Sequence, residues 1–132
     1  ANSILPEKRM LSSMTPTIVE KDGELLMSVG TPGGSTIITS VLQTILNIHE
    51  FNMTAQQAVD APRFHHQWLP DVVMFEPNMF DDSLIKAIQD LGYETCVREN
   101  VITGKDNAIL KLPDGKLEGG ADHRGDDTAS GH

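Results

Sequence analysis

The amino-acid sequence predicts an α/β fold of the α+β kind, and three observations predict it. An apolar run over 25–29 is followed by a Pro-Gly-Gly turn and then by apolar residues at helical spacing over 37–48. Two Asp-Gly pairs, at 22–23 and 114–115, each lie between apolar runs, which is typical of β-hairpins. A further helical pattern over 82–91 leads into an alternating segment over 93–97.

The first hairpin is expected from strands over 17–20 and 25–29. A helix follows, and Ser35 or Thr36 is expected to cap its first turn, because a hydroxyl oxygen there accepts an unpaired backbone N–H. No charged residue occurs between Leu25 and Asn47, and Thr, Ser, Gln and Asn fill the positions off the apolar face. We therefore expect this helix to be covered on more than one side.

The remaining elements follow from local signals. Thr54 and Gln57 form a capping box for a helix over 54–61, which Pro62 ends. An irregular connection over 63–68 precedes a strand over 72–75. Asp81 or Asp82 begins the next helix, Gly92 ends it, and a strand over 93–97 follows. The second hairpin has strands over 108–112 and 116–118. A compact core over 10–118 and a flexible tail over 119–132 are expected, because the tail is rich in Gly, Asp and small residues.

The bulk composition narrows the function classes. The 132 residues are enough for one domain, and the net charge of −9 argues against nucleic acid and anionic membrane surfaces as partners. The single cysteine, Cys96, excludes an intrachain disulfide and is expected to pack in a strand. His65 and His66 are adjacent and would face opposite sides of a strand, and the five histidines show no HxxxH or HxH spacing. We expect no metal or other cofactor.

The Pro-Gly-Gly turn is the strongest candidate for chemistry. Gly33 and Gly34 allow close approach of a ligand, and their N–H groups lie at a helix N-terminus that favours negative charge. Three interpretations stay open: a site for a standing anion, an oxyanion hole for acyl transfer, or a plain connector. No GK[ST] and no GxGxxG is present, which weakens the phosphate interpretation. No GxSxG elbow is present either, and Asp81-Asp82 and Asp126-Asp127 are interpreted as a cap and a solvated tail.

Four segments together resemble one family. LSSMTPTIV, GTPGGS, AVDAPRFHHQWLPD and the Gly-Ala-Asp near the end are similar, in order and spacing over residues 2–122, to the C-terminal region of γ-glutamyltranspeptidases. The resemblance implies an αββα N-terminal-nucleophile hydrolase sandwich, of which residues 1–132 would form the C-terminal part of the small subunit. It further implies γ-glutamyl transfer from glutathione and related compounds to water, amino acids or peptides, through a γ-glutamyl-enzyme intermediate on a threonine.

The resemblance also assigns residues. Ser12 and Ser13 match the paired serines that help to hold the γ-glutamyl carboxylate, and Gly33 and Gly34 match the oxyanion-hole glycines. Residue 1 is Ala and no threonine precedes Ser12, so we expect the nucleophile outside these residues and an isolated fragment without activity. The chain departs from the family pattern at two positions, and neither changes the matched site. Thr36 stands where many relatives have arginine, and His123 stands where many have proline.

Partners and location are implied in the same way. The large subunit and the N-terminal part of the small subunit of the same precursor are the expected protein partners, and a γ-glutamyl compound is the expected small-molecule partner. A fragment without these protein partners would expose apolar surface and an unpaired sheet edge, and it is therefore expected to self-associate. Family members are commonly periplasmic, secreted or surface-bound. Two alternatives stay open: a related acylase or poly-γ-glutamate depolymerase of the same fold, and a noncatalytic anion-binding or interaction module.

Overall fold

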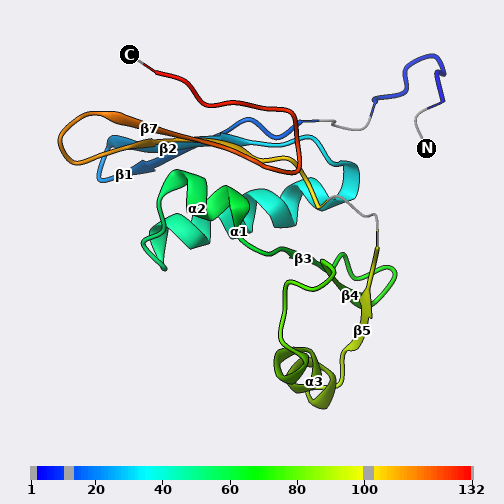
Figure 1. The fold of residues 1–132 in the computed structure, drawn as a ribbon. Helices are drawn as coiled ribbons and strands as arrows, with labels where there is room; N and C mark the ends of the chain where they lie inside the picture. Colours follow the sequence, from blue (N-terminus) through cyan, green and yellow to red (C-terminus); the bar gives the residue numbers. More distant parts are fainter. Residues whose placement is uncertain (1–2, 11–13, 100–102, 132) are drawn as a thin grey trace.

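The computed structural model describes residues 3–10, 14–99 and 103–131 of the chain. Within these ranges the strands form two sheets, and the helices pack beside them (Figure 1). In chain order the elements are β1 (Thr17–Lys21), β2 (Glu24–Gly30), the 3₁₀ turn η1 (Gly34–Thr36), α1 (Ile37–His49), α2 (Ala55–Asp60), β3 (Phe64–His65), β4 (Val72–Phe75), α3 (Asp82–Asp90), β5 (Glu94–Val97), β6 (Asn107–Lys111) and β7 (Leu117–Ala121).

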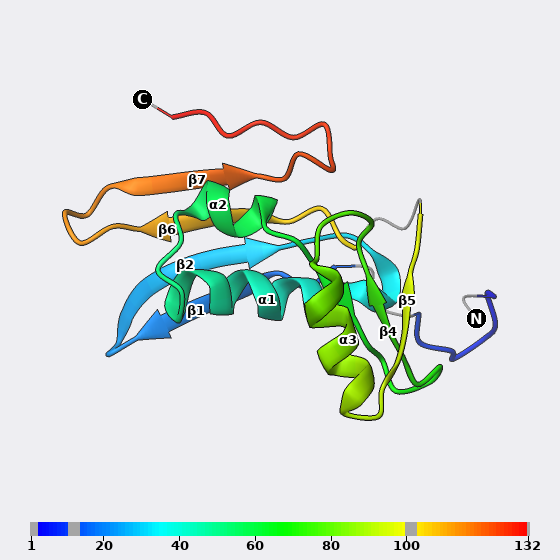
Figure 2. The ribbon, with the colours of Figure 1, turned by 60° about the horizontal axis from the view of Figure 1, so that its bottom comes forward.

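The larger sheet has four antiparallel strands in the order β1-β2-β6-β7. Both predicted hairpins are confirmed. Asp22 and Gly23 have φ values of 54° and 82°, so both central positions of the first turn are left-handed, as the Asp-Gly pair predicts. Both α1 and α2 lie on one face of this sheet (Figures 1 and 2).

The core lies between this sheet and its two helices. Alternate residues of β2 and β6 face inward, and they pack against α1 and α2 in two clusters; the buried members are Met27, Val29, Val41, Ile48, Ala58, Val59 and Ala108. On the opposite face of the sheet Ile18, Ile109 and Leu117 are exposed. The sheet is therefore apolar on both faces, which is typical of the inner layer of a sandwich.

The smaller sheet has the order β3-β4-β5, with β3 antiparallel and β5 parallel to β4. The bounds predicted for the 72–75 strand are confirmed, and α3 connects β4 to β5. The prediction that 63–68 is an irregular connection is wrong at two residues. Phe64 and His65 form β3, because they pair with Phe75 and Met74 of β4. Two residues are too few to produce the alternating pattern by which a strand is found in a sequence.

The expected side-chain cap at Ser35 or Thr36 is wrong. An N-cap residue has an extended backbone and accepts from an N–H group, whereas Thr36 is helical, with φ −80° and ψ −11°. Its hydroxyl instead donates to the Gly33 carbonyl, at 2.9 Å. The 3₁₀ turn therefore begins the helix without a side-chain cap. At the next helix the capping box of Thr54 and Gln57 is confirmed.

Helix α1 is covered on more than one side, as predicted, by β2 and by α2. A third side carries Ile38, Leu42 and Leu46, which are spaced by four residues and exposed. The expected self-association rests on surfaces of this kind and stays a prediction. No helix among the described residues is long and apolar enough to cross a membrane.

The boundary between core and tail at residue 119 is corrected. Gly119, Gly120 and Ala121 belong to β7, and Asp122 beyond them is buried. A Cβ at Gly120 would lie 2.5 Å from the Ala55 carbonyl oxygen, so glycine allows β7 to approach α2 closely. Gly120, which in the sequence resembles part of a flexible tail, is therefore needed here for packing.

Candidate active site

The Pro-Gly-Gly turn joins the end of β2 to the start of α1. Gly33 has φ 151° and ψ 12°, and Gly34 has φ 62°. Both φ values lie where glycine is favoured over residues with a side chain. A Cβ at Gly33 would lie 2.8 Å from the Thr36 hydroxyl and 3.1 Å from the Gly104 Cα, whereas a Cβ at Gly34 would meet nothing within 4 Å. Gly33 is therefore the more tightly constrained of the two.

The two glycine N–H groups are candidates for binding negative charge. Both glycines are exposed, and within 3–10, 14–99 and 103–131 neither N–H donates to a protein acceptor. A ψ of 12° at Gly33 places both nitrogens on the same side of its Cα, as in anion-binding turns. The start of the helix adds its dipole to these donors. This geometry would suit an anion or an oxyanion, and the role of the two glycines stays a prediction.

A loop over 103–106 packs against this turn. A Cβ at Gly104 would lie 2.5 Å from the Ser40 hydroxyl, and the Lys105 N–H donates to Thr31 Oγ1 at 2.6 Å. The Ser40 hydroxyl bonds both the Thr103 carbonyl and the Asp106 carboxylate, each at 2.8 Å. The turn is thus held from behind by a loop that enters β6.

A buried ionic network lies next to this loop. Arg63, which is 1% exposed, pairs with Asp122 at 2.7 Å and with Asp106 at 3.5 Å. Thr44 and Ser40 of α1 donate to Asp106, and the Asp106 N–H donates to Asp122. Every charge in this part of the network therefore has an opposite charge and hydrogen bonds, which buried charges require.

Arg124 extends the network to the end of β4. Its guanidinium makes two hydrogen bonds to Glu76, at 2.8 and 2.6 Å, and one to Asp122 at 3.0 Å. Burial raises the pKa of the Glu76 carboxyl, but the hydrogen bonds from Arg124, Thr103 and the Arg63 N–H outweigh it, so this pKa lies below its ordinary value. Burial raises the pKa of the Asp122 carboxyl as well. Hydrogen bonds from the Arg124 and Asp106 N–H groups, together with the charge and hydrogen bond of Arg63, outweigh it, so this pKa also lies below its ordinary value.

Sequence reasoning missed this network. Arg63 belongs to the segment interpreted as an irregular connection, Asp122 and Arg124 belong to the one interpreted as a flexible tail, and the charges of the network are far apart along the chain. The available signal was that Arg63 and Asp122 lie within the two motifs AVDAPRFHHQWLPD and Gly-Ala-Asp. Neither motif shows by itself that the two residues pair.

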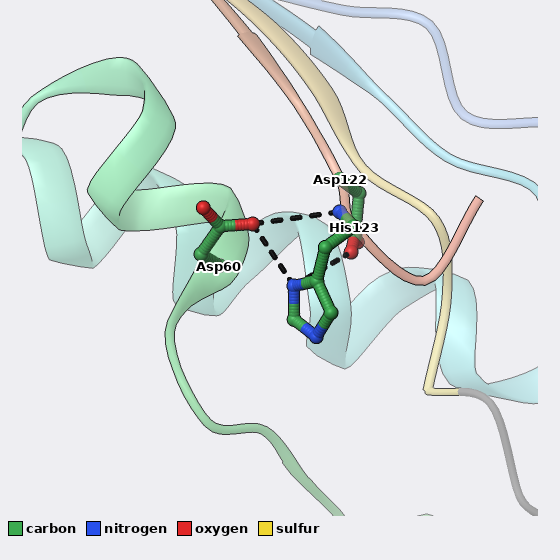
Figure 3. Close-up of side chains that lie close together, drawn as sticks. All are labelled: Asp60, Asp122 and His123. Carbon is green, nitrogen blue, oxygen red and sulfur yellow. Dashed lines mark hydrogen bonds and ion pairs between the residues drawn. The ribbon is translucent and has the colours of Figure 1, made fainter. Parts of the chain in front are cut away.

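Asp60, Asp122 and His123 form a small cluster at the edge of the network (Figure 3). One ligand atom from each lies within 4.8 Å of the others. His123 Nδ1 bonds Asp60 Oδ1 at 2.9 Å, while Asp122 Oδ1 already accepts from the N–H and the guanidinium of Arg124. Hydrogen bonds and ion pairs account for this arrangement, and it supplies no argument for a metal ion.

Of the other candidate residues, Ser12 and Ser13 lie outside the described residues. His65 is buried between Thr39 and Gln67, and His66 pairs with Asp71 at 2.8 Å, so the packing and hydrogen-bonding roles expected of them are confirmed. Cys96 lies half-buried in β5, as expected.

We expect acid to weaken the fold through this network. The ordinary pKa values are 4.5 for Glu76 and 3.8 for Asp122, and both are lowered in the folded protein. Their contribution to stability is therefore complete above these values and is lost as pH falls through the lower folded values. The thermal midpoint should be nearly constant from about pH 7 to about pH 5 and then fall. Glu76→Gln should be less stable at neutral pH and show a shallower acid decline; an unchanged decline would contradict the assignment.

The family model described as Gamma-glutamyltranspeptidase matches residues 1–132. The chain belongs to the γ-glutamyltranspeptidase family. The glutathione hydrolase proenzyme of Escherichia coli K12 is 44% identical over 133 residues, which cover 100% of this chain and 22% of that protein. An acylase ACY 1 proenzyme of Pseudomonas sp. V22 is 38% identical over 128 residues, 97% of this chain and 22% of that protein. The chain thus spans about a fifth of the length of these curated relatives.

Solved structures of this family agree with the fold. The Helicobacter pylori γ-glutamyltranspeptidase T380A mutant has a TM-score of 0.82 and 42% identity, covering 92% of this chain and 66% of that one. The W525D mutant of the Pseudomonas nitroreducens enzyme has a TM-score of 0.84 and 35% identity, covering 99% and 68%. The predicted fold class, part of an αββα N-terminal-nucleophile hydrolase sandwich, is confirmed.

Proposed function

We propose that this chain supplies the oxyanion hole of a γ-glutamyltransferase and glutathione hydrolase. The observation that supports this most directly is a pair of exposed glycines, Gly33 and Gly34, in the turn before α1 of a family member, whose N–H groups donate to no protein acceptor within the described residues. Such donors stabilise an acyl-transfer transition state because the carbonyl oxygen becomes negative only as the reaction proceeds. A standing anion site would use the same donors without that change.

In the proposed reaction a threonine outside these 132 residues attacks the γ-glutamyl amide carbon, and its own α-amino group accepts the hydroxyl proton. The carbonyl oxygen becomes an oxyanion and accepts from the Gly33 and Gly34 N–H groups. The amine leaves with a proton, and a γ-glutamyl ester remains. Water, an amino acid or a peptide then attacks this ester, and the threonine hydroxyl is regenerated.

The test uses the full-length gene product with glutathione and with a γ-glutamyl anilide. We expect release of the amine, and a γ-glutamyl product on an added amino acid. Mass spectrometry of a quenched reaction should find a γ-glutamyl adduct on one threonine. Absence of turnover and of the adduct would overturn the proposed function and favour the noncatalytic module.

Ser12 and Ser13 are proposed to donate hydrogen bonds to the α-carboxylate of the substrate. In the full-length protein Ser12→Ala and Ser13→Ala should each raise KM, because a hydrogen bond to a charged group contributes about 1.5–3 kcal/mol. The kcat should change little if the bond is equally strong in the ground and transition states. Ser83→Ala, at an exposed serine of α3 outside the candidate site, is the matched control. An unchanged KM in both variants would show that these serines play another part.

The remaining partners are proposals of the same kind. The relatives named proenzymes support a longer precursor, in which a large subunit and the N-terminal part of the small subunit complete the site. A periplasmic, secreted or surface-bound location is proposed from the family resemblance. Fractionation of cells that express the full-length protein would test it.

A related acylase activity is the second candidate, because an acylase proenzyme matches 97% of the chain at 38% identity. Both activities would use the same oxyanion hole and differ in the acyl group. Ratios of kcat/KM for a γ-glutamyl anilide and for an acyl amide without an α-amino group would separate them. We expect a large preference for the γ-glutamyl compound.

A further inference from the structure

Two threonine hydroxyls hold the two peptide units that carry the Gly33 and Gly34 N–H groups. Thr31 Oγ1 donates to the Pro32 carbonyl at 2.8 Å, and Thr36 Oγ1 donates to the Gly33 carbonyl at 2.9 Å. The Pro32 carbonyl shares its peptide unit with the Gly33 N–H, and the Gly33 carbonyl shares its unit with the Gly34 N–H. Each donor of the proposed oxyanion hole is thus paired with one hydroxyl.

The geometry of the peptide bond makes these contacts directional. Among the described residues the only cis peptide is Leu69–Pro70, so both units in the turn are trans. In a planar trans peptide the C=O and N–H bonds point in opposite directions. A hydrogen bond that fixes the carbonyl therefore fixes the direction of the N–H on the other side of the same plane.

The environment of Thr31 determines which way its hydroxyl donates. The Lys105 N–H, which can only donate, bonds Thr31 Oγ1 at 2.6 Å. The single hydroxyl proton is therefore available for the Pro32 carbonyl. Thr31 is itself buried, so no competing solvent acceptor lies beside it. The contact with Lys105 also joins the turn to the loop over 103–106.

Thr36 acts on the second peptide unit through two groups. Its hydroxyl and its backbone N–H both donate to the Gly33 carbonyl, the latter at 3.3 Å. Thr36 is also buried, and its hydroxyl lies where a Cβ at Gly33 would project. The same side chain thus holds the Gly33 carbonyl and fills the space behind Gly33.

We propose that Thr31 and Thr36 are positioning residues that orient the two N–H donors of the oxyanion hole. The assignment rests on the proposed function of Gly33 and Gly34. Neither hydroxyl contacts the reacting atoms; each acts through a carbonyl on the opposite side of a peptide plane. Donors that are already oriented need no reorganisation when the oxyanion forms, and this is where their effect on rate arises.

The test uses Thr31→Val and Thr36→Val in the full-length protein. Valine keeps the β-branched shape and removes the hydroxyl. We expect kcat to fall about 10-fold at each position, which is less than the 10²–10³ for loss of a whole donor, with KM changed less than about two-fold. Thr31→Ser and Thr36→Ser retain the hydroxyl and should recover most of kcat. Each position holds a different peptide unit, so if one valine variant fails to fold, the other decides.

Thr54→Val is the matched control. Its hydroxyl also bonds local backbone, at the cap of α2, so this variant should lower the thermal midpoint and leave kcat unchanged. If both valine variants keep wild-type kcat while Gly33→Ala has lost it, the assignment is overturned and the proposed function stands. If the serine variants lose as much kcat as the valine variants, the hydroxyls are not responsible. If the wild-type protein does not turn over γ-glutamyl compounds, the proposed function and this assignment fail together.

Discussion

Gly33→Ala is expected to lower kcat by about 10²–10³ in the full-length protein, with KM changed far less. Alanine cannot easily adopt the φ of 151° found at Gly33, and its Cβ would lie 2.8 Å from the Thr36 hydroxyl and 3.1 Å from the Gly104 Cα. Relief of these contacts must rotate the peptide planes that carry the two N–H donors. An oxyanion hole depends on those directions in the transition state, so the loss should appear in kcat.

Gly34→Ala is the matched comparison. Its Cβ would meet nothing within 4 Å, so the substitution adds the strain of a φ of 62° without a clash. We expect a loss in kcat of about 10-fold or less. Circular dichroism and the thermal midpoint should show that both variants fold, and kinetics with a γ-glutamyl anilide should separate kcat from KM. Equal, small effects at both positions would identify the turn as a connector only.

The sequence predicts this turn well because its determinants are local. A strand, a Pro-Gly-Gly turn and an apolar helical pattern lie within one short stretch, and both Asp-Gly hairpins and the Thr54 capping box are equally local. The error at Ser35 and Thr36 shows the limit of such reasoning. Whether a hydroxyl accepts from an N–H or donates to a carbonyl depends on backbone angles that residue identity does not determine.

Features that depend on distant contacts were not predictable in this way. Gly120 belongs to a segment with the composition of a flexible tail, and only the approach of β7 to α2 explains it. The ionic network is a stronger case. Arg63 and Asp122 are 59 residues apart along the chain, and a charged side chain is ordinarily predicted to be exposed. The folded topology is what brings them together behind the loop over 103–106.

Removal of Arg63 should therefore be the most destabilising substitution in the network. Arg63→Leu leaves the buried Asp106 without a cationic partner among the described residues and leaves Asp122 with Arg124 as its remaining arginine partner, and breaking a buried pair costs about 3–5 kcal/mol. The guanidinium also donates to the Val59 and Thr103 carbonyls. Arg63→Lys should rescue little, because one ammonium group cannot reach all these acceptors. The measurement is the midpoint of denaturant unfolding of the full-length protein.

Two comparisons identify the mechanism of that loss. Lys86→Ala removes an exposed ion pair with Asp90 and should change stability by less than about 0.5 kcal/mol. Arg63→Leu combined with Asp106→Asn should be more stable than Arg63→Leu alone, because the penalty comes from the Asp106 charge that is left without a cation and not from the lost arginine itself. If the combined variant is less stable than Arg63→Leu, the network does not act through charge compensation. If Arg63→Leu is as mild as Lys86→Ala, the buried pair contributes no more than an exposed one.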